Sequence, residues 1–133
     1  MSEATLTQLG SLRGRRILVV EDEYMIAQEI ADELWTVGAE TLGPVARIDD
    51  ALGLIEIEET IDAALLDVNL GSAAVWPVVD SLLAYRVPVV LATGYDASAI
   101  PAAYAHLPRC EKPMAASDLV RALAQVLVPL ARH

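Results

Sequence analysis

The residues of this chain that could do chemistry follow short apolar runs, at points where strands would end. Two acids follow the run 17–20, an acid follows 63–66 and a threonine follows 87–92, and the only lysine of the chain comes after all three runs, at the end of a brief expected strand, 108–111. These residues are Glu21, Asp22, Asp67, Thr93 and Lys112. Short apolar runs separated by stretches of helical periodicity are typical of buried parallel strands. The carboxyl ends of such strands meet along one edge of an open α/β sheet, where ligands bind. The spacing therefore predicts that these side chains share one crevice.

The carboxylates in that crevice would favour a bound cation. Carboxylates a few ångströms apart repel one another by a few kcal/mol per pair, even at an effective dielectric constant of about 20. Mg²⁺ suits them because it binds through one or two carboxylates, keeps water molecules and accepts phosphate oxygens. Lys112 would add a compact positive charge from the other side, and Thr93 a hydroxyl that can donate. This combination indicates phosphoryl transfer with Asp67 as the nucleophile.

The alternation of apolar runs and helical patterns predicts an α/β fold. Strands are expected at about 16–20, 40–42, 63–66, 87–92 and 108–111. Helices are expected at about 24–37, from 49 or 50 to 57, around 78–83, at 99–105 and from 117 onward. The second strand should stop at Gly43-Pro44, and Pro101 should weaken the short helix around it. Five strands alternating with five helices favour a doubly wound parallel sheet of order 2-1-3-4-5 between two helical layers.

The chain is predicted to form one domain, residues 15–133, after a short N-terminal extension, residues 1–14. Leucines recur at three-residue spacing in this extension, at Leu6, Leu9 and Leu12. The extension is therefore either a helical turn packed on the domain or a frayed tail.

The composition limits the classes of partner. A formal net charge of −10 argues against direct binding of nucleic acid. No apolar run is long enough to span a bilayer, and the polar N-terminus does not look like a signal peptide. The single cysteine, Cys110, excludes an internal disulfide and fits a reducing compartment. These features predict a cytoplasmic protein without a nucleic-acid or membrane partner.

In their order and strand context, the motifs resemble the receiver domains of two-component response regulators, from about residue 15 to residue 130. The resemblance rests on six residues, namely Glu21, Asp22, Asp67, Thr93, Lys112 and Pro113. It implies a flavodoxin-like fold, Asp67 as phosphoacceptor, Thr93 as switch hydroxyl and Lys112 as a contact of the phosphoryl group. It also implies a cis peptide bond before Pro113. The resemblance further implies that three carboxylates and one backbone carbonyl arrange Mg²⁺, from Glu21, Asp22, Asp67 and Asn69.

The same resemblance implies the partners. A histidine kinase or a histidine phosphotransfer protein would supply the phosphoryl group, and phosphorylation would switch the binding of a downstream protein. Such a domain catalyses only its own phosphorylation and dephosphorylation and is not a conventional enzyme. We expect a monomer or weak dimer, acting as a stand-alone regulator without an output domain or excised from a longer protein. A stand-alone receiver could shuttle phosphate, compete for it or bind a target directly.

Two departures from the usual receiver pattern affect the expected switch. Arg109 occupies the position, three residues before the lysine, where most receivers carry a switch Phe or Tyr. The segment Leu91–Asp96 instead looks like the Phe-Ala-Thr-Gly-x-Tyr variant of alphaproteobacterial receivers, with Leu91 for Phe and Asp96 for Tyr. Our hypothesis is that Tyr95 and the loop after Thr93 form the bistable element. The short interval from Thr93 to the lysine, with Pro101 inside it, predicts a fourth helix that is either abbreviated or partly disordered.

Other functions remain open at the level of the sequence. A phosphatase of the haloacid-dehalogenase type also uses an aspartate nucleophile, but it would want a second acid where Asn69 stands. A degenerate receiver would serve only as a binding module, yet it would lack an acid or the lysine. A nucleotide-binding flavodoxin-like domain is disfavoured because no glycine-rich turn follows the first strand.

Overall fold

The computed structural model describes residues 10–71, 73–94, 100–112 and 114–131. The helices are α2 (Tyr24–Thr36), α3 (Ile48–Ile57), α4 (Trp76–Ala84), the 3₁₀ turn η2 (Ala102–Tyr104) and α5 (Ala116–Ala131). The strands are β1 (Arg16–Val20), β2 (Glu40–Val45), β3 (Ala63–Asp67), β4 (Asn69–Leu70), β5 (Ala73–Ala74), β6 (Val89–Thr93) and β7 (Arg109–Glu111). No helix among these residues is long and apolar enough to cross a membrane.

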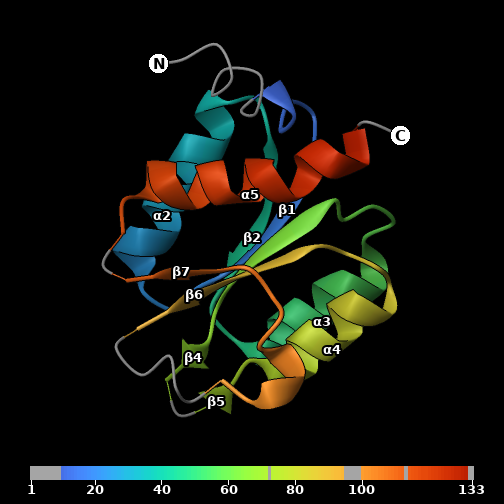
Figure 1. Ribbon diagram of the computed structural model, residues 1–133. Helices are drawn as coiled ribbons and strands as arrows, with labels where there is room; N and C mark the ends of the chain where they lie inside the picture. Colours follow the sequence, from blue (N-terminus) through green and yellow to red (C-terminus); the bar gives the residue numbers. More distant parts are fainter. Residues whose placement is uncertain (1–9, 72, 95–99, 113, 132–133) are drawn as a thin grey trace.

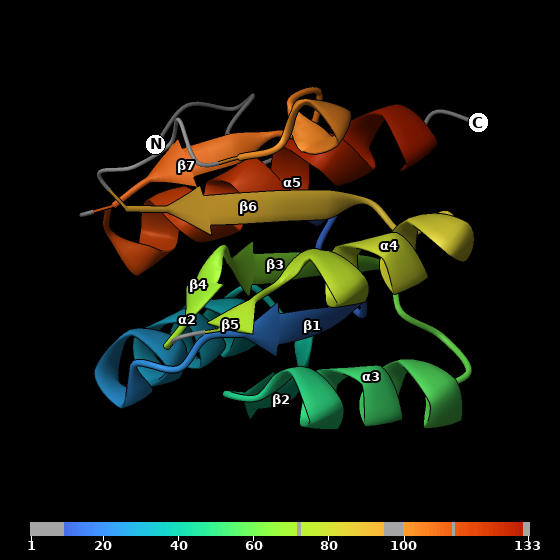
Figure 2. The ribbon, with the colours of Figure 1, turned by 90° about the horizontal axis from the view of Figure 1, so that it is seen from below.

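Five parallel strands form the central sheet, in the order β2-β1-β3-β6-β7. The strand that leads to the phosphoacceptor candidate lies in the middle, where Val20 of β1 pairs with Leu66 of β3. On its other side, Asp67 pairs with Ala92 of β6. The predicted fold class and strand order are therefore confirmed, and all five strands point the same way (Figure 2).

Helices cover both faces of the sheet (Figure 1). Side chains alternate along each strand, so Ile17 and Val19 of β1 pack with α2 and α5, whereas Leu18 and Val20 pack with α3 and α4. The strands β1, β3 and β6 are buried on both faces, which explains why they are nearly continuous apolar runs in the sequence.

The described part of the N-terminal extension is packed on the domain. The side chain of Leu12 is fully buried in the core between α2 and α5. The Ser11 hydroxyl donates a hydrogen bond of 3.4 Å to the Ala124 carbonyl of α5, and the Gly14 N–H donates one of 2.8 Å to the Gly38 carbonyl. Residues 10–14 are therefore packed on the domain, which was one of the two alternatives expected for this extension.

Strand β2 runs past the point where the sequence predicted its end. It continues through Gly43-Pro44, a cis peptide bond, to Val45, which pairs with Val20 after a register shift. Gly43 has a φ of 90°, and a Cβ at this position would lie 2.7 Å from the Val45 nitrogen. Only glycine fits this irregular strand, so the expected end at Gly43 was wrong.

Two further segments differ from the expected pattern. The loop expected after Asp67 contains a short antiparallel hairpin, β4–β5. Five α-helices were expected, but in the described part of residues 94–108 the only helical element is the single turn η2, which follows Pro101. This single turn agrees with the prediction of an abbreviated fourth helix.

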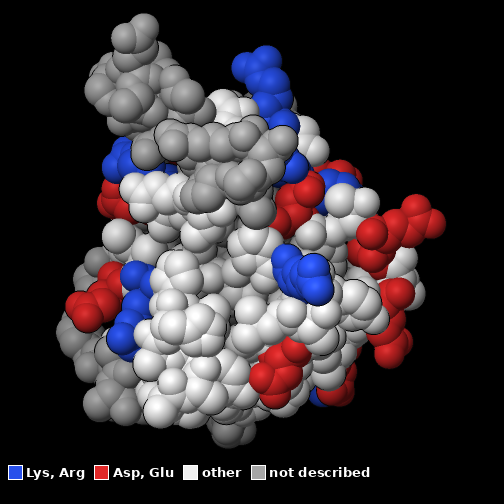
Figure 3. Space-filling view, turned by 45° about the vertical axis from the view of Figure 1, so that its right-hand side comes forward, with Lys and Arg blue, Asp and Glu red and all other residues white. Residues whose placement is uncertain are grey.

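Charged side chains are spread unevenly over the face drawn in Figure 3. Acidic side chains gather along the right-hand side of this view, and a broad area in its lower part has few charged side chains. The chain carries 19 acidic and 9 basic residues, so the acidic side chains set the sign of the net charge.

Candidate functional site

The ends of four neighbouring strands bring the candidate residues to one edge of the sheet. Asp67 and Thr93 are the last residues of β3 and β6, Glu21 follows β1, and Lys112 follows β7. The backbone fixes these positions, because Glu21 N–H donates to a β2 carbonyl at 2.9 Å and Lys112 N–H donates to the Thr93 carbonyl at 2.6 Å. This edge is the switch-point crevice expected for the doubly wound order.

The acidic residues lie together as the sequence predicted. Carboxylate oxygens of Glu21, Asp22 and Asp67 lie within 4.8 Å of one another. Glu21 and Asp67 are buried, whereas Asp22 is exposed. The cluster therefore has two buried acids at its base and one acid facing solvent.

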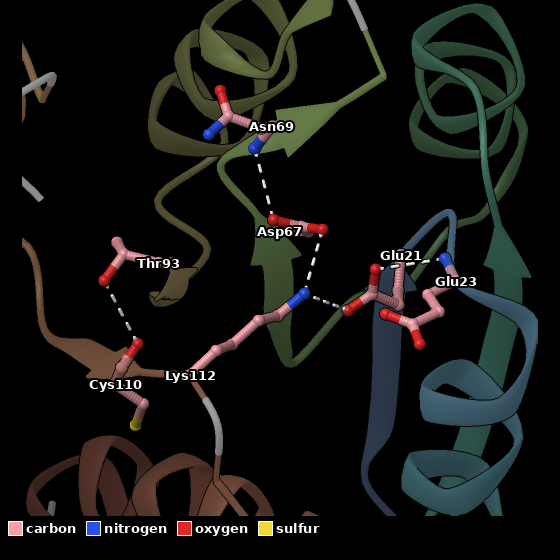
Figure 4. A network of polar contacts seen from close by, with 7 residues as sticks. All are labelled: Glu21, Glu23, Asp67, Asn69, Thr93, Cys110 and Lys112. Carbon is pink, nitrogen blue, oxygen red and sulfur yellow. Dashed lines mark hydrogen bonds and ion pairs between the residues drawn. The ribbon is translucent and has the colours of Figure 1, made fainter. Parts of the chain in front are cut away.

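Lys112 joins the two buried acids. Its Nζ donates a hydrogen bond of 2.8 Å to Glu21 Oε1 and one of 3.0 Å to Asp67 Oδ2 (Figure 4). Burial lowers the pKa of Lys112, but the hydrogen bonds with both acids outweigh it and leave that pKa above its usual value. The ammonium group is therefore charged at neutral pH and screens the two carboxylates from each other.

The pKa of Glu21 differs strongly from that of an exposed glutamate. Burial, and then the neighbouring Asp67 carboxylate, raise this pKa to about 7, although Lys112 acts in the opposite direction. One cation therefore does not fully compensate the crowded carboxylates, which is the physical situation in which a metal ion binds.

Backbone N–H groups hold the carboxylates from the other side. Asn69 N–H donates to Asp67 Oδ1 at 3.2 Å, and Glu23 N–H donates to Glu21 Oε2 at 3.2 Å. The side-chain amide of Asn69 points away from Asp67 in Figure 4. The residue two positions after each acid thus orients that acid through its backbone.

Thr93 is buried, and its hydroxyl is turned toward β7. Its Oγ1 donates a hydrogen bond of 3.4 Å to the Cys110 carbonyl (Figure 4). The same threonine accepts the backbone hydrogen bond of Lys112 through its carbonyl. The hydroxyl therefore links β6 to β7 and makes no hydrogen bond to Asp67 in this arrangement.

These residues fit Mg²⁺. A hard cation prefers oxygen ligands, and Mg²⁺ in particular takes one or two carboxylates together with water and phosphate. The exposed acid Asp22 leaves the cluster open to solvent on one side, while burial and the neighbouring Asp67 carboxylate raise the pKa of Glu21.

Some predicted residues and contacts stand apart from this cluster. Tyr95 and Pro113 lie outside the described residues, so the proposed aromatic switch and the cis bond before Pro113 remain predictions. Arg109 is exposed on β7. Sequence reasoning missed the Cys110 carbonyl and the Glu23 N–H, because they are backbone atoms that any residue type supplies.

No protein-family model matches the chain, and no curated protein matches it. Among solved structures, a response regulator receiver protein from Sinorhizobium medicae WSM419 shares the fold, with a TM-score of 0.75 at 22% identity over 92% of this chain and 99% of that chain. The solution structure of SdrG from Sphingomonas melonis Fr1 is 36% identical over 86% of this chain and 98% of that chain, with a TM-score of 0.74. This chain belongs to the receiver domains of response regulators.

The receiver domain is also similar to the BeF₃-activated conformation of SdrG from Pseudomonas melonis Fr1. The two chains are 37% identical over 85% of this receiver and 96% of that chain, with a TM-score of 0.70. As the sequence predicted, the receiver domain is a signalling module of the two-component type.

Proposed function

We propose that this receiver domain takes a phosphoryl group onto Asp67 from a histidine kinase or a histidine phosphotransfer protein, and that phosphorylation switches the binding of a downstream protein. The observation that carries the proposal is the Lys112 ammonium, which lies within 3.0 Å of Asp67 Oδ2 at the open edge of the sheet. It supplies a positive charge where the oxygens of a transferring phosphoryl group would collect.

The transfer needs no further base. A carboxylate oxygen of Asp67 attacks the phosphorus of a phosphohistidine, the phosphorus–nitrogen bond breaks, and its electron pair stays on the imidazole nitrogen. Lys112 neutralises the oxygens of the moving group, and Asn69 N–H keeps the Asp67 carboxylate oriented through its hydrogen bond of 3.2 Å.

Mg²⁺ completes the site in this proposal. Three carboxylates would hold it, from Glu21, Asp22 and Asp67, together with the backbone carbonyl of Asn69 that the resemblance to receivers implies. When bound, Mg²⁺ would screen the approach of an anionic donor to Asp67. The exposed position of Asp22 supports entry of the ion from solvent.

The switch is the least conventional part of the proposed function. We infer that the chain follows the Phe-Ala-Thr-Gly-x-Tyr variant and that Tyr95, with the loop after Thr93, changes position on phosphorylation. The exposed Arg109 in place of a strand aromatic supports this reading, because no aromatic ring is present there to move with Thr93. Replacing Tyr95 by Ala should change the phosphoryl lifetime or the affinity for the partner, and no change in either would contradict the proposal.

Intact mass after incubation with acetyl phosphate tests the phosphoacceptor directly. We expect one phosphoryl adduct that requires Mg²⁺ and that is absent from Asp67→Ala. Asp62→Ala is the matched control, since this acid pairs with Arg15 at the opposite end of β3. BeF₃ gives a second test that needs no covalent transfer, because an activated conformation with this group exists for SdrG. An adduct that survives Asp67→Ala would refute the assignment.

A further inference from the structure

Three side chains join the helix that follows Asp67 to the segment that follows Thr93. Trp76 of α4 stacks on Tyr104 of η2, with ring centroids 4.5 Å apart and ring planes 8° from parallel. The Tyr104 hydroxyl donates a hydrogen bond of 2.7 Å to Asp80 Oδ1, one turn further along α4. Figure 1 shows η2 directly beside α4. We call Trp76, Asp80 and Tyr104 the aromatic clasp.

The α4 side of the clasp is tied to the strand end that carries Asp67. Val75, the residue before α4, donates its N–H to the Val68 carbonyl at 3.3 Å, and Val68 directly follows Asp67. The Val68 N–H in turn donates to the Ala92 carbonyl at 3.0 Å, next to Thr93. Two backbone hydrogen bonds therefore connect the start of α4 to the ends of β3 and β6.

The η2 side of the clasp leads to Lys112. Leu107 N–H donates to the Tyr104 carbonyl at 3.1 Å, and the Leu107 side chain is buried in the core just before β7. In the described part of residues 94–108, Tyr104 is the residue whose side chain hydrogen-bonds to another element. The clasp is thus the side-chain polar attachment of the described part of this connection, in addition to the backbone hydrogen bond from Leu91 N–H to the Pro108 carbonyl.

The clasp can open at small cost. Asp80 is exposed and Tyr104 is half-buried, so water can replace their hydrogen bond without leaving a buried polar group unpaired. The stacked rings are also near the surface, because Trp76 is only half-buried. Such a contact is strong enough to favour one arrangement and weak enough to be reversed by ligand binding.

We propose that the aromatic clasp is a latch that favours the unphosphorylated arrangement of the site and loosens when Asp67 is phosphorylated. The inference rests on the proposed function. With the clasp closed, the Thr93 hydroxyl faces the Cys110 carbonyl at 3.4 Å, and it must leave that carbonyl to reach a phosphoryl oxygen on Asp67. Because the movement of Thr93 weakens the clasp, the free energy of the closed clasp opposes this movement. The coupling is reciprocal, so an open clasp favours the phosphorylated arrangement.

Fluorescence of Trp76 reports on the latch. The chain has two tryptophans, and Trp35 is 81% exposed on α2, so Trp35→Phe isolates the signal of Trp76. Titration with BeF₃ in Mg²⁺ should change the emission of Trp76 as the ring stack loosens. In this background Tyr104→Phe keeps the ring but loses the hydroxyl, and the half-saturating concentration of BeF₃ should fall by between about two- and tenfold.

Two control variants distinguish coupling between the clasp and BeF₃ binding from a general effect on the stability of the domain. Asp80→Asn keeps an oxygen acceptor for Tyr104 and should titrate like its parent. Tyr85→Phe removes an exposed hydroxyl at the other end of α4 and should also leave the BeF₃ affinity unchanged. A clasp that is only structural would lower the melting temperature in Tyr104→Phe without shifting this affinity, and that result would overturn the proposal.

The fluorine NMR signal of bound BeF₃ separates a failure of the latch from a failure of the phosphoacceptor assignment. If BeF₃ binds but Trp76 emission does not change, the latch is refuted while the phosphoacceptor assignment stands. If BeF₃ does not bind and acetyl phosphate gives no adduct, the proposed function fails and the latch fails with it.

Discussion

At the residue scale, Glu21 should make the stability of the metal-free domain depend on pH. Its pKa is raised from 4.5 to about 7 in the folded domain, so between these values the folded state holds a proton that the unfolded state has lost. The free energy of unfolding should therefore fall as the pH rises through this window. Urea unfolding in EDTA at several pH values measures the slope, which should be shallower in Glu21→Gln. Equal slopes in both proteins would show that another group is responsible.

Lys112 should stabilise the folded domain, because its positive charge compensates two buried acids. Lys112→Met leaves Glu21 and Asp67 without their shared cation, and we expect a loss of about 1–3 kcal/mol in the free energy of unfolding without metal. Mg²⁺ should stabilise this variant more than the wild type, since no ammonium then competes for the carboxylates. Thermal unfolding with and without Mg²⁺ measures both effects.

Arg47→Met is the control for that measurement. The Arg47 side chain is exposed and lies 3.7 Å from an exposed acid, so its removal should change stability by less than about 1 kcal/mol. A Lys112→Met variant as stable as this control would mean that the two acids do not need the lysine for folding.

Residue types predicted which side chains share the sheet edge but not their hydrogen bonds. The acids and Thr93 could be placed on one sheet edge because they follow apolar runs in the sequence, and Lys112 because it follows a brief expected strand, residues 108–111. The orientation of the Thr93 hydroxyl toward Cys110 could not be predicted, because the acceptor is a main-chain carbonyl on another strand. The aromatic clasp was also missed, since Trp76 and Tyr104 are 28 positions apart and each alone reads as an ordinary packing residue.

At the element scale, β2 depends on a glycine. Gly43→Ala would place a Cβ 2.7 Å from the Val45 nitrogen in a backbone with φ of 90°, and we expect a loss of more than about 1 kcal/mol. Gly53→Ala is the matched control, because its Cβ would meet nothing within 4 Å and it lies within helix α3. That variant should gain about 0.5–1 kcal/mol. Urea unfolding of both variants tests the pair, and equal effects would contradict the irregular strand.

The bounds of elements with a strong apolar pattern were predicted to within a few residues. The bounds of elements that depend on local backbone geometry were not. The runs that became β1, β3 and β6 are buried on both faces, so the sequence marks them clearly. The extension of β2 through Gly43-Pro44 and the β4–β5 hairpin depend on pairing with neighbouring strands, which no local pattern encodes.

At the scale of the whole molecule, the segment before β1 holds the two helices of one face together. Leu12→Ala would leave a cavity between α2 and α5, and we expect a loss of about 2–5 kcal/mol. Leu83→Ala, at a partly exposed position on α4, should cost much less. Urea unfolding compares the two variants, and similar losses would mean that the described part of the N-terminal extension adds nothing to the core.

The two open edges of the sheet also govern how copies of this domain behave at high concentration. An unpaired strand edge is a template on which other chains can add, and such addition leads to fibrils and precipitates. Edge strand β2 carries Pro44, which has no N–H to offer, and edge strand β7 is only three residues long, with charged Arg109 and Glu111 on either side of Cys110. Both edges therefore resist edge-to-edge pairing with a strand of another copy, and the arginine that stands where most receivers carry an aromatic adds its charge to one of these edges.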